Sequence, residues 1–263
     1  MTTTTTDEIL TERRGNVLWV TFNRPQARNA MTFAMYERLD HIALEANEDP
    51  SLRAIVLTGA GGKAFVAGTD ISQFRSFNTP EDALGYEERM DRILGNLERI
   101  RVPTIAAIAG ACTGGGAAIA ASCDLRIGSP SAKFGFPIAR TLGNCLSMGN
   151  YARLVALLGV ARTKDLIFTA RFMDAQEGLA TGLLSEVTPD EASLPARAEQ
   201  LAKLLASHAP LTLRATKEAL LRIQQRLVPE KSSDLVLMCY MSQDFKEGIE
   251  AFFEKRKADW KGE

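Results

Sequence analysis

The stretch that decides the fold reads CTGGGAAIAASCD and runs from Cys112 to Asp124. The buried-strand pattern Thr104–Ile108 precedes it, and an alanine-rich helical pattern follows the glycines. Where a strand passes through glycines into a helix, unpaired N–H groups lie at the positive end of the helix dipole, and no Cβ keeps a ligand away. The same glycines also suit a tight crossing that needs only small residues. The stretch therefore predicts an anion site or a closely packed junction.

Composition and motifs exclude several classes of partner. The formal net charge of -1 gives no electrostatic reason for nucleic acid or an anionic membrane to be the main partner. No apolar run approaches the length of a membrane span. The glycines lack both the Lys-Ser/Thr of a P-loop and the G-x-G-x-x-G spacing of dinucleotide sites. We therefore expect neither nucleic acid, nor a membrane, nor a nucleotide cofactor.

Strand and helix patterns alternate around the glycines. Apolar residues recur at helical spacing after Thr32, a predicted N-cap, and again over Pro80–Ile100. The strand patterns are Val17–Phe22, Ala54–Thr58, Phe65–Gly68, Thr104–Ile108 and Leu125–Ile127. This alternation predicts α/β layering around a largely parallel sheet. Past about residue 190 only helical patterns remain, namely Leu194–His208, Leu211–Gln225 and Ser233–Arg256.

The cysteines and the N-terminal residues indicate the cellular compartment in which we expect the protein. Cys112, Cys123, Cys145 and Cys239 show no pair spacing, which favours free thiols in a reducing compartment. The first residues, MTTTTTDEIL, lack an apolar h-region and an Arg-rich stretch, so we expect a cytoplasmic protein. Thr2–Thr6 is interpreted as a frayed tail.

A second stretch resembles a known family. KAFVAGTDI, Lys63–Ile71, is similar to the K-A-F-x-A-G-x-D-[IL] signature of the crotonase family, also called the enoyl-CoA hydratase and isomerase family. The glycine-rich segment from Ile108 to Asp124 matches that family too. Further matches are Asn23–Ala30, Ala132–Gly135, Asp244–Ile249 and Phe253–Arg256. The resemblance covers essentially the whole chain in the right order.

The resemblance implies a fold and a ligand class. The fold is an α/β spiral of repeated strand-strand-helix turns, with a core over residues 1–190 that binds acyl-CoA. Residues 191–263 form a helical trimerisation region, so a homotrimer or a dimer of trimers (a hexamer) is expected. The ligand is an acyl-CoA thioester of the kind used in fatty acid metabolism. No cofactor is implied, because coenzyme A is part of the substrate.

The resemblance also assigns residues. In the family, two backbone N–H groups form an oxyanion hole for the thioester oxygen as it becomes an enolate, and by motif these belong to Thr69 and Gly115. Preset donors strengthen as charge develops, and losing one typically costs ~3 kcal/mol. The residues expected to contact the acyl-CoA are Arg28, Ala30, Ala67, Thr69, Asp70, Ile71, Gly115, Arg140, Phe252 and Lys255, with Lys255 facing phosphate.

The chain departs from its relatives at the acid-base positions. Family hydratases place one glutamate two positions after the glycine triplet and another after the proline of A-x-F-G-x-P. Here Ala118 and Ile138 occupy those positions, and neither side chain titrates. A two-glutamate hydration mechanism therefore cannot run from them.

Several polar residues could substitute, and each has a structural alternative. Asp70 is a candidate base, or a helix N-cap and loop brace. Arg140 could pair with a carboxylate on the acyl group, or with an intrasubunit partner. Asp124 is expected to brace the glycine-rich helix against the next strand.

The loop that follows carries Thr141, Asn144, Cys145 and Ser147, where relatives with other chemistries place catalytic groups. Cys145 is a possible nucleophile, but a buried inert thiol is the commoner role. Neither His41 nor His208 falls in a motif, and no ligand cluster recommends a metal.

Four functions remain open. The first is a hydratase or isomerase with displaced proton-transfer groups. The second is an acyl-CoA decarboxylase or thioester hydrolase, since loss of carbon dioxide itself generates the enolate. The third is a non-catalytic acyl-CoA-binding member. The fourth, RNA binding, is disfavoured because no basic cluster with interleaved aromatics is present.

Overall fold

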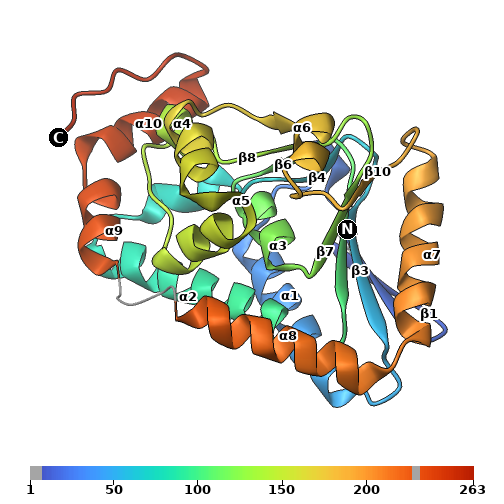
Figure 1. The fold of residues 1–263 in the computed structure, drawn as a ribbon. Helices are drawn as coiled ribbons and strands as arrows, with labels where there is room; N and C mark the ends of the chain where they lie inside the picture. The colour runs from blue at the N-terminus through green and yellow to red at the C-terminus, as the bar shows by residue number, and fades with distance from the viewer. Residues whose placement is uncertain (1–7, 227–231) are drawn as a thin grey trace, which may run out of the picture.

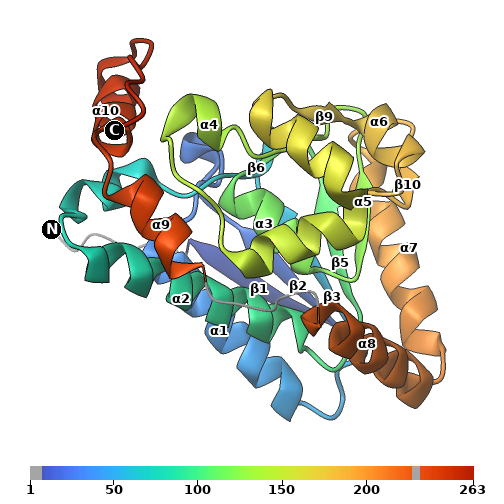
Figure 2. The ribbon, with the colours of Figure 1, turned by 60° about the vertical axis from the view of Figure 1, so that its left-hand side comes forward.

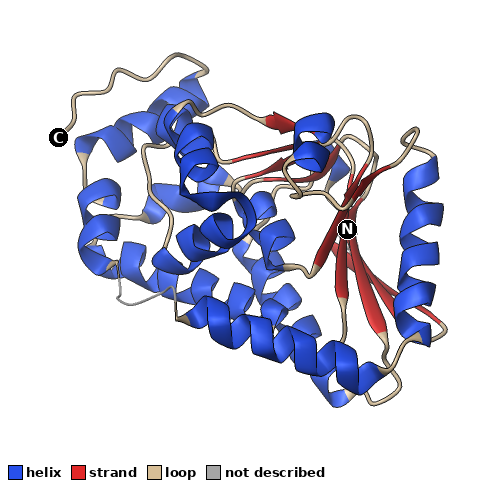
Figure 3. Cartoon of the chain, viewed as in Figure 1, coloured by secondary structure: helices blue, strands red, loops and turns tan. Residues whose placement is uncertain are grey.

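The computed structural model describes residues 8–226 and 232–263, so the predicted tail Thr2–Thr6 lies outside the described residues. Two sheets organise the chain (Figures 1 and 3). The larger has the order β1-β2-β3-β5-β7-β10 and is parallel except for the β1–β2 pair. Its strands are β1 (Ile9–Arg14), β2 (Val17–Phe22), β3 (Ala54–Gly59), β5 (Thr104–Ile108), β7 (Leu125–Gly128) and β10 (Glu186–Val187).

The smaller sheet has the order β4-β6-β8-β9, with an antiparallel pair only between β8 and β9. Its strands are β4 (Ala64–Ala67), β6 (Ala111–Thr113), β8 (Lys133–Gly135) and β9 (Met173–Asp174). The chain steps from the larger sheet to the smaller one and then into a helix, three times. The turns are β3-β4-α2, β5-β6-α3 and β7-β8-α4, where α2 is Pro80–Glu98, α3 is Gly115–Ser122 and α4 is Ile138–Thr141. The predicted spiral of strand-strand-helix turns is confirmed.

The larger sheet buries both faces. One face packs against α7 (Ser193–Ser207), where Trp19 and Val56 meet Ala198 and Ala202 of the helix (Figure 1). The other face packs with α1 (Phe33–Glu48), α2 and α3 around a core that includes Phe22, Leu57 and Ile119. Continuous apolar strands suit a parallel sheet covered on both sides.

Local signals place the helices that reach the site. The hydroxyl of Thr32 accepts the N–H of Met35, which confirms the predicted N-cap of α1. The start of α2 has a reciprocal capping box between Thr79 and Asp82, with Pro80 in the first turn. These caps fix where α1 and α2 begin, and the two helices then pack against each other.

After β8 the chain is mostly helical. α5 (Met148–Phe168) is interrupted at Gly159, where φ is 74°. α6 (Ala175–Ala180) precedes β10, and from α7 onward the described residues form only helices, with α8 at Pro210–Gln225, α9 at Ser233–Tyr240 and α10 at Gln243–Glu254. Ser233–Arg256 is two helices rather than one run, because the Ser242 hydroxyl caps a new helix by accepting the Phe245 N–H. No helix in the two described ranges has both the length and the apolar character that crossing a membrane requires.

The last helices contact the core through aromatic rings. The rings of Phe74 and Phe245 lie 6.2 Å apart, and those of Tyr86 and Tyr240 lie 6.3 Å apart. Phe74 belongs to the 3-10 turn η2 (Ile71–Ser76), and a shorter turn, η1 (Pro25–Ala27), follows β2. Figure 2 shows α10 projecting from the body beyond α9. The division at residue 190 and the role of residues 191–263 in trimerisation remain predictions.

Candidate active site

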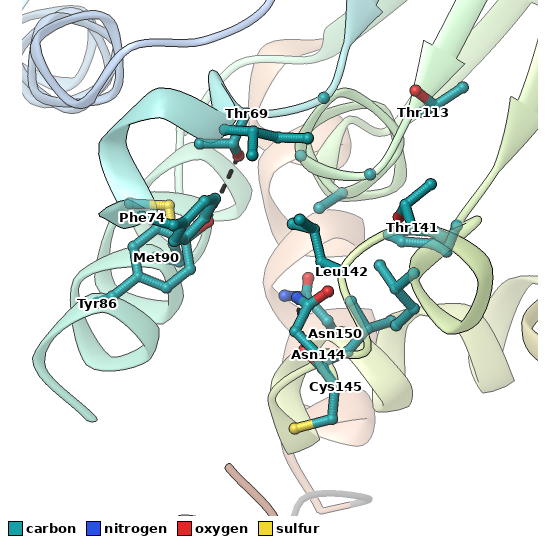
Figure 4. A pocket seen from close by; sticks show the side chains of 18 of the residues that line it. Thr69, Phe74, Tyr86, Met90, Thr113, Thr141, Leu142, Asn144, Cys145 and Asn150 are labelled. Atoms are coloured by element: carbon teal, nitrogen blue, oxygen red, sulfur yellow. Dashed lines mark hydrogen bonds between the residues drawn. The ribbon is translucent and has the colours of Figure 1, made fainter. Parts of the chain in front are cut away.

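One cavity of about 200 Å³ opens where α2, α3 and the segment after β8 meet the ends of the smaller sheet's strands. Its walls are mostly apolar. Figure 4 shows Phe74, Tyr86 and Met90 on one side, Thr113 and Thr141 on the other, and Asn144, Asn150 and Cys145 at one end. Apolar walls with a few converging polar groups are typical of a small-molecule site.

The three glycines of the deciding stretch have different tasks. Gly114 and Gly115 line the cavity. Gly116 does not, and a Cβ there would overlap the carbonyl oxygen of Val66 in β4. Gly114 has φ 53° and ψ -120°, and a Cβ on it would lie 3.5 Å from Cα of Gly68. Gly116 is therefore required for packing, whereas Gly114 and Gly115 line the cavity and their role as an anion site stays a prediction.

The N–H of Thr69 points away from its neighbouring strand. The N–H of Met31 donates to the Gly68 carbonyl at 2.9 Å, and the N–H of Asp70 donates to the Met31 carbonyl at 2.8 Å. The residue between two such bonds directs its own N–H to the opposite side. On that side lie β6 and the start of α3, so the Thr69 N–H is directed toward the glycines.

The N–H of Gly115 is the first of α3 and has no partner within the helix, as at every helix start. Two hydroxyls, those of Tyr36 and Thr69, lie close to the place where its Cβ would be. The Tyr36 hydroxyl lies 2.8 Å from Oγ1 of Thr69, which in turn lies 3.4 Å from the Tyr86 hydroxyl (Figure 4 shows Thr69 and Tyr86). Burial raises the pKa of Tyr36 to about 12. These hydroxyls are therefore neutral donors and acceptors beside the two N–H groups.

Ala118 and Ile138 both line the cavity. They are 6% and 8% exposed, so neither position is open to bulk water. The positions where the resemblance expects glutamates are thus inside the pocket and apolar.

The other predicted contacts divide into two groups. Ala67, Ile71 and Phe252 line the cavity. Arg28, Ala30, Asp70, Arg140 and Lys255 do not.

Asp70 instead caps η2 by accepting the Ser72 N–H, and it pairs with Arg24 at 3.2 Å. This geometry is the brace that was the alternative interpretation of Asp70. Arg140 is exposed, with its guanidinium 6.0 Å from the Phe172 ring, so its position does not place it against an acyl carboxylate.

Asp124 bridges different elements from those expected. Its Oδ2 accepts the Thr104 N–H at 2.7 Å and the Lys217 ammonium at 2.6 Å. It therefore ties the start of β5 to α8.

Among the loop candidates, Thr141, Asn144 and Cys145 line the cavity, but Ser147 does not. The Ser147 hydroxyl caps α5 and donates to Asp91 at 2.6 Å. The pKa of the Cys145 thiol is raised, first by the hydrogen bond between Cys145 and Cys239 and then by burial. The Cys145 thiol therefore stays protonated and is a poor nucleophile. The Thr141 hydroxyl donates to the Pro137 carbonyl at 3.0 Å.

Neither histidine of the chain lies in the cavity wall. His41 and His208 are exposed and line none of its wall. Within residues 8–226 and 232–263, no three His, Cys, Asp or Glu side chains gather as a metal site would need.

Sequence reasoning missed Glu87, the only acidic residue in the described part of the cavity wall. It lies on α2, is 8% exposed, and accepts the Tyr240 hydroxyl at 2.6 Å. Burial, the largest influence, raises the pKa of Glu87 to about 7, and the nearby Asp91 adds to the effect. A signal existed, because Glu87 lies three and seven residues before Met90 and Leu94 and thus shares their apolar face.

Comparison with known proteins places these features in a family. The sequence profile described as enoyl-CoA hydratase/isomerase matches residues 12–263. A short-chain-enoyl-CoA hydratase from Clostridium acetobutylicum is 37% identical over 96% of this chain and 97% of its own.

Two solved structures extend the comparison. An enoyl-CoA hydratase/carnitine racemase from Magnetospirillum magneticum is 32% identical, with a TM-score of 0.79 over 98% of this chain and 97% of its own. A methylmalonyl-CoA decarboxylase in complex with 2-nitronate-propionyl-CoA is 27% identical, with a TM-score of 0.88 over 98% of this chain and 99% of its own.

Proposed function

Because the chain belongs to the enoyl-CoA hydratase/isomerase family, a family of enzymes, we propose that it converts an acyl-CoA thioester through an enolate. The thioester oxygen lies between the N–H groups of Thr69 and Gly115, and the acyl group occupies the apolar cavity. The observation that supports the proposal is that Thr69 and Gly115 line the same cavity, with Gly115 as the first residue of α3. Donors fixed before the reaction stabilise the oxyanion without reorganising as charge develops.

The reaction itself has two candidates. A hydratase or isomerase is supported by the similar hydratase from Clostridium acetobutylicum. A decarboxylase or thioester hydrolase is supported by two observations. The fold is similar to that of methylmalonyl-CoA decarboxylase, and apolar side chains stand at positions 118 and 138. Decarboxylation needs an oxyanion hole and few titratable groups, because the departing carbon dioxide leaves its electron pair to the enolate.

The first experiment separates these reactions. The purified protein is incubated with crotonyl-, methylmalonyl- and aromatic acyl-CoA esters, and products are identified by mass spectrometry. Loss of carbon dioxide from methylmalonyl-CoA identifies a decarboxylase, and addition of water to crotonyl-CoA identifies a hydratase. Tight binding of an ester without any product would reject the enzyme proposal in favour of an acyl-CoA-binding protein.

The second experiment tests the oxyanion hole. A proline at position 115 removes the N–H, but any Cβ there meets the Tyr36 hydroxyl. We therefore compare Gly115→Pro and Gly115→Ala, both in a Tyr36→Phe background. The alanine variant keeps the N–H and adds the same Cβ, so it is the matched control. We expect turnover to fall at least 100-fold in the proline variant relative to the alanine variant. Equal turnover in two folded variants would exclude the Gly115 N–H from catalysis.

The contacts of the coenzyme A moiety and the assembly belong to the same proposal. Lys255 ends α10 with φ 55° and is exposed, and Phe252 in the same helix reaches the cavity wall. We infer that Lys255 faces a phosphate of coenzyme A and that Arg28 and Ala30 also contact the acyl-CoA. A trimer or a dimer of trimers and a cytoplasmic location also stay proposals.

A further inference from the structure

Glu87 is a buried acid, and the packing of α2 does not require a carboxyl at its position. Its carboxyl lines a cavity whose neighbouring residues on the same face of α2, Met90 and Leu94, are apolar. Burying a carboxyl among such groups is unfavourable unless hydrogen bonds compensate it. Tyr240 supplies one such bond, from a helix more than 150 positions further along the chain. A polar pair assembled at this cost inside a ligand cavity indicates a chemical task.

We propose that Glu87 is the catalytic acid-base group of this enzyme, and that it exchanges a proton with the acyl carbon next to the thioester. This inference rests on the proposed function, because it needs an acyl-CoA bound with its thioester oxygen at Thr69 and Gly115. It gives the proton-transfer task to α2, whereas the missing glutamates would have stood on α3 and α4.

The location of Glu87 supplies a route for the proton. Glu87 lines the acyl cavity and also a second cavity of about 290 Å³, whose wall includes Asp91 and Ser147. Ser147 donates to Asp91 at 2.6 Å, and Arg153 lies 3.9 Å from the same carboxylate. A proton taken from the ligand on one side can therefore leave on the other without crossing the acyl cavity.

A second buried polar group faces the same cavity. The amide nitrogen of Asn144 donates to the Tyr240 hydroxyl at 3.2 Å, so Asn144 holds the phenol that holds Glu87. Its amide oxygen is buried and, among the described residues, lacks a hydrogen-bond partner. A buried acceptor without a partner indicates that a donor from the ligand or a water completes the site.

Atoms and electrons balance when Glu87 removes a proton from the α-carbon. The Glu87 carboxylate takes a proton from the α-carbon, the C–H pair becomes the enolate double bond, and the thioester oxygen receives the carbonyl π pair. The reverse step returns a proton from the Glu87 carboxyl to the carbon and restores the thioester. No oxidant, metal or second substrate takes part.

Charges near Glu87 set its protonation. Asp91 lies one turn further along α2 and opposes ionisation, whereas the Tyr240 hydroxyl favours it. The other titratable groups whose charge interacts with Glu87 are Tyr36, Tyr86, Cys145 and Tyr151. All four are neutral at pH 7 because their pKa values are raised, so at that pH they add no charge that would shift the pKa of Glu87. A catalytic acid-base group works best with a pKa near the operating pH.

The test uses butyryl-CoA, which needs no further reaction partner. The enzyme is saturated with butyryl-CoA in D₂O, and deuterium incorporation at the α-carbon is followed by mass spectrometry. We expect wild-type exchange to rise with pH to a plateau, with its midpoint near pH 7, because the carboxylate form takes the proton. Glu87→Gln should reduce exchange at saturation at least 100-fold. Glu81→Gln, at an exposed glutamate in the first turn of α2 that lines neither cavity, is the matched control and should leave exchange unchanged.

A second variant keeps the proposal testable if Glu87→Gln does not fold. Tyr240→Phe removes a hydrogen bond that favours the carboxylate, so it should move the midpoint of the exchange profile to higher pH. A purely structural role for Tyr240 would lower the plateau without moving the midpoint.

Two results would overturn the assignment. One is wild-type protein that binds butyryl-CoA but shows no α-carbon exchange at any pH. The other is a folded Glu87→Gln variant that exchanges within threefold of wild type at saturation. Failure of the proposed function would give a different result, because titration calorimetry would then detect no binding of butyryl-CoA.

Discussion

The hydroxyl of Tyr36 lies 2.8 Å from Oγ1 of Thr69, and both oxygens occupy the space that a side chain on Gly115 would need. Three segments far apart in the sequence thus meet at one point. α1 supplies the phenol, the segment after β4 supplies the threonine, and α3 begins at the glycine.

This relationship predicts coupling between positions 36 and 115. Gly115→Ala keeps the N–H but pushes a methyl group against the Tyr36 hydroxyl, and overpacking of this kind costs about 1–3 kcal/mol. Tyr36→Phe removes the obstructing oxygen, so the double variant should be more stable than the sum of the single changes predicts. Urea unfolding of the four proteins gives the coupling free energy. A coupling near zero would show that the glycine is not required for space.

A second prediction concerns hydration. Wild-type protein should hydrate crotonyl-CoA poorly, because Ala118 and Ile138 cannot activate water. Ala118→Glu combined with Ile138→Glu should raise this activity more than either single change. Burying two acids at these positions costs ~2 to 4 kcal/mol, so the double variant is assayed at low temperature.

The measurement is the decrease in absorbance of the enoyl thioester. Ala118→Gln with Ile138→Gln is the control, since it adds similar volume without an ionisable group. A wild-type rate on the order of 10 per second or faster would mean that other residues already supply the acid and base. Glu87 would then be the first of them to substitute.

The sequence predicted the parts of the site that depend on local backbone. Thr69 and Gly115 could be assigned from the KAFVAGTDI stretch and the glycine triplet, because the residues of each motif are neighbours in the sequence. Alternating strand and helix patterns also predicted layering around a largely parallel sheet, whereas the spiral of two sheets was predicted from the family resemblance. The capping role of Asp70 could also be predicted, because the N–H that it accepts belongs to Ser72, two positions away.

The parts that depend on distant packing were out of reach. Glu87 lies in an amphipathic helix, where a sequence alone cannot tell a buried acid from a solvated one at the edge of the apolar face. Its burial results from Tyr240, whose ring closes over α2 from α9. Asp124 likewise pairs with Lys217 across 93 positions, a contact that no local pattern specifies.

A third prediction concerns stability and pH. The pKa of Glu87 is about 7 in the folded protein and near 4.5 for an unperturbed glutamate. Between these values the folded state keeps a proton that the unfolded state releases, so stability falls as pH rises from about 4.5 to about 7. The loss amounts to about 3 kcal/mol for such a shift.

Glu87→Gln cannot release a proton, so it should lack this part of the pH dependence. The free energies of unfolding of wild type and variant are compared in urea at pH 5 and pH 8. We expect the variant to gain on the wild type by about 2.5 kcal/mol between the two values, because part of the total loss already occurs below pH 5. Taking the difference cancels the titration of the groups that do not interact with Glu87. Parallel curves would mean that Glu87 titrates normally in the folded protein.

The fourth prediction concerns assembly and rests on α8. None of its residues is buried within one chain, and Leu211, Leu220 and Ile223 are 76%, 61% and 63% exposed. Such an apolar face is unfavourable in water, and a second copy of the chain, as the family resemblance implies, would cover it. Light scattering should give three or six times the mass of one chain. Leu220→Glu with Ile223→Glu should lower that mass, because charges would enter the contact, whereas Leu44→Glu, at an exposed leucine on α1, should not. A wild-type monomer at micromolar concentration would contradict the prediction.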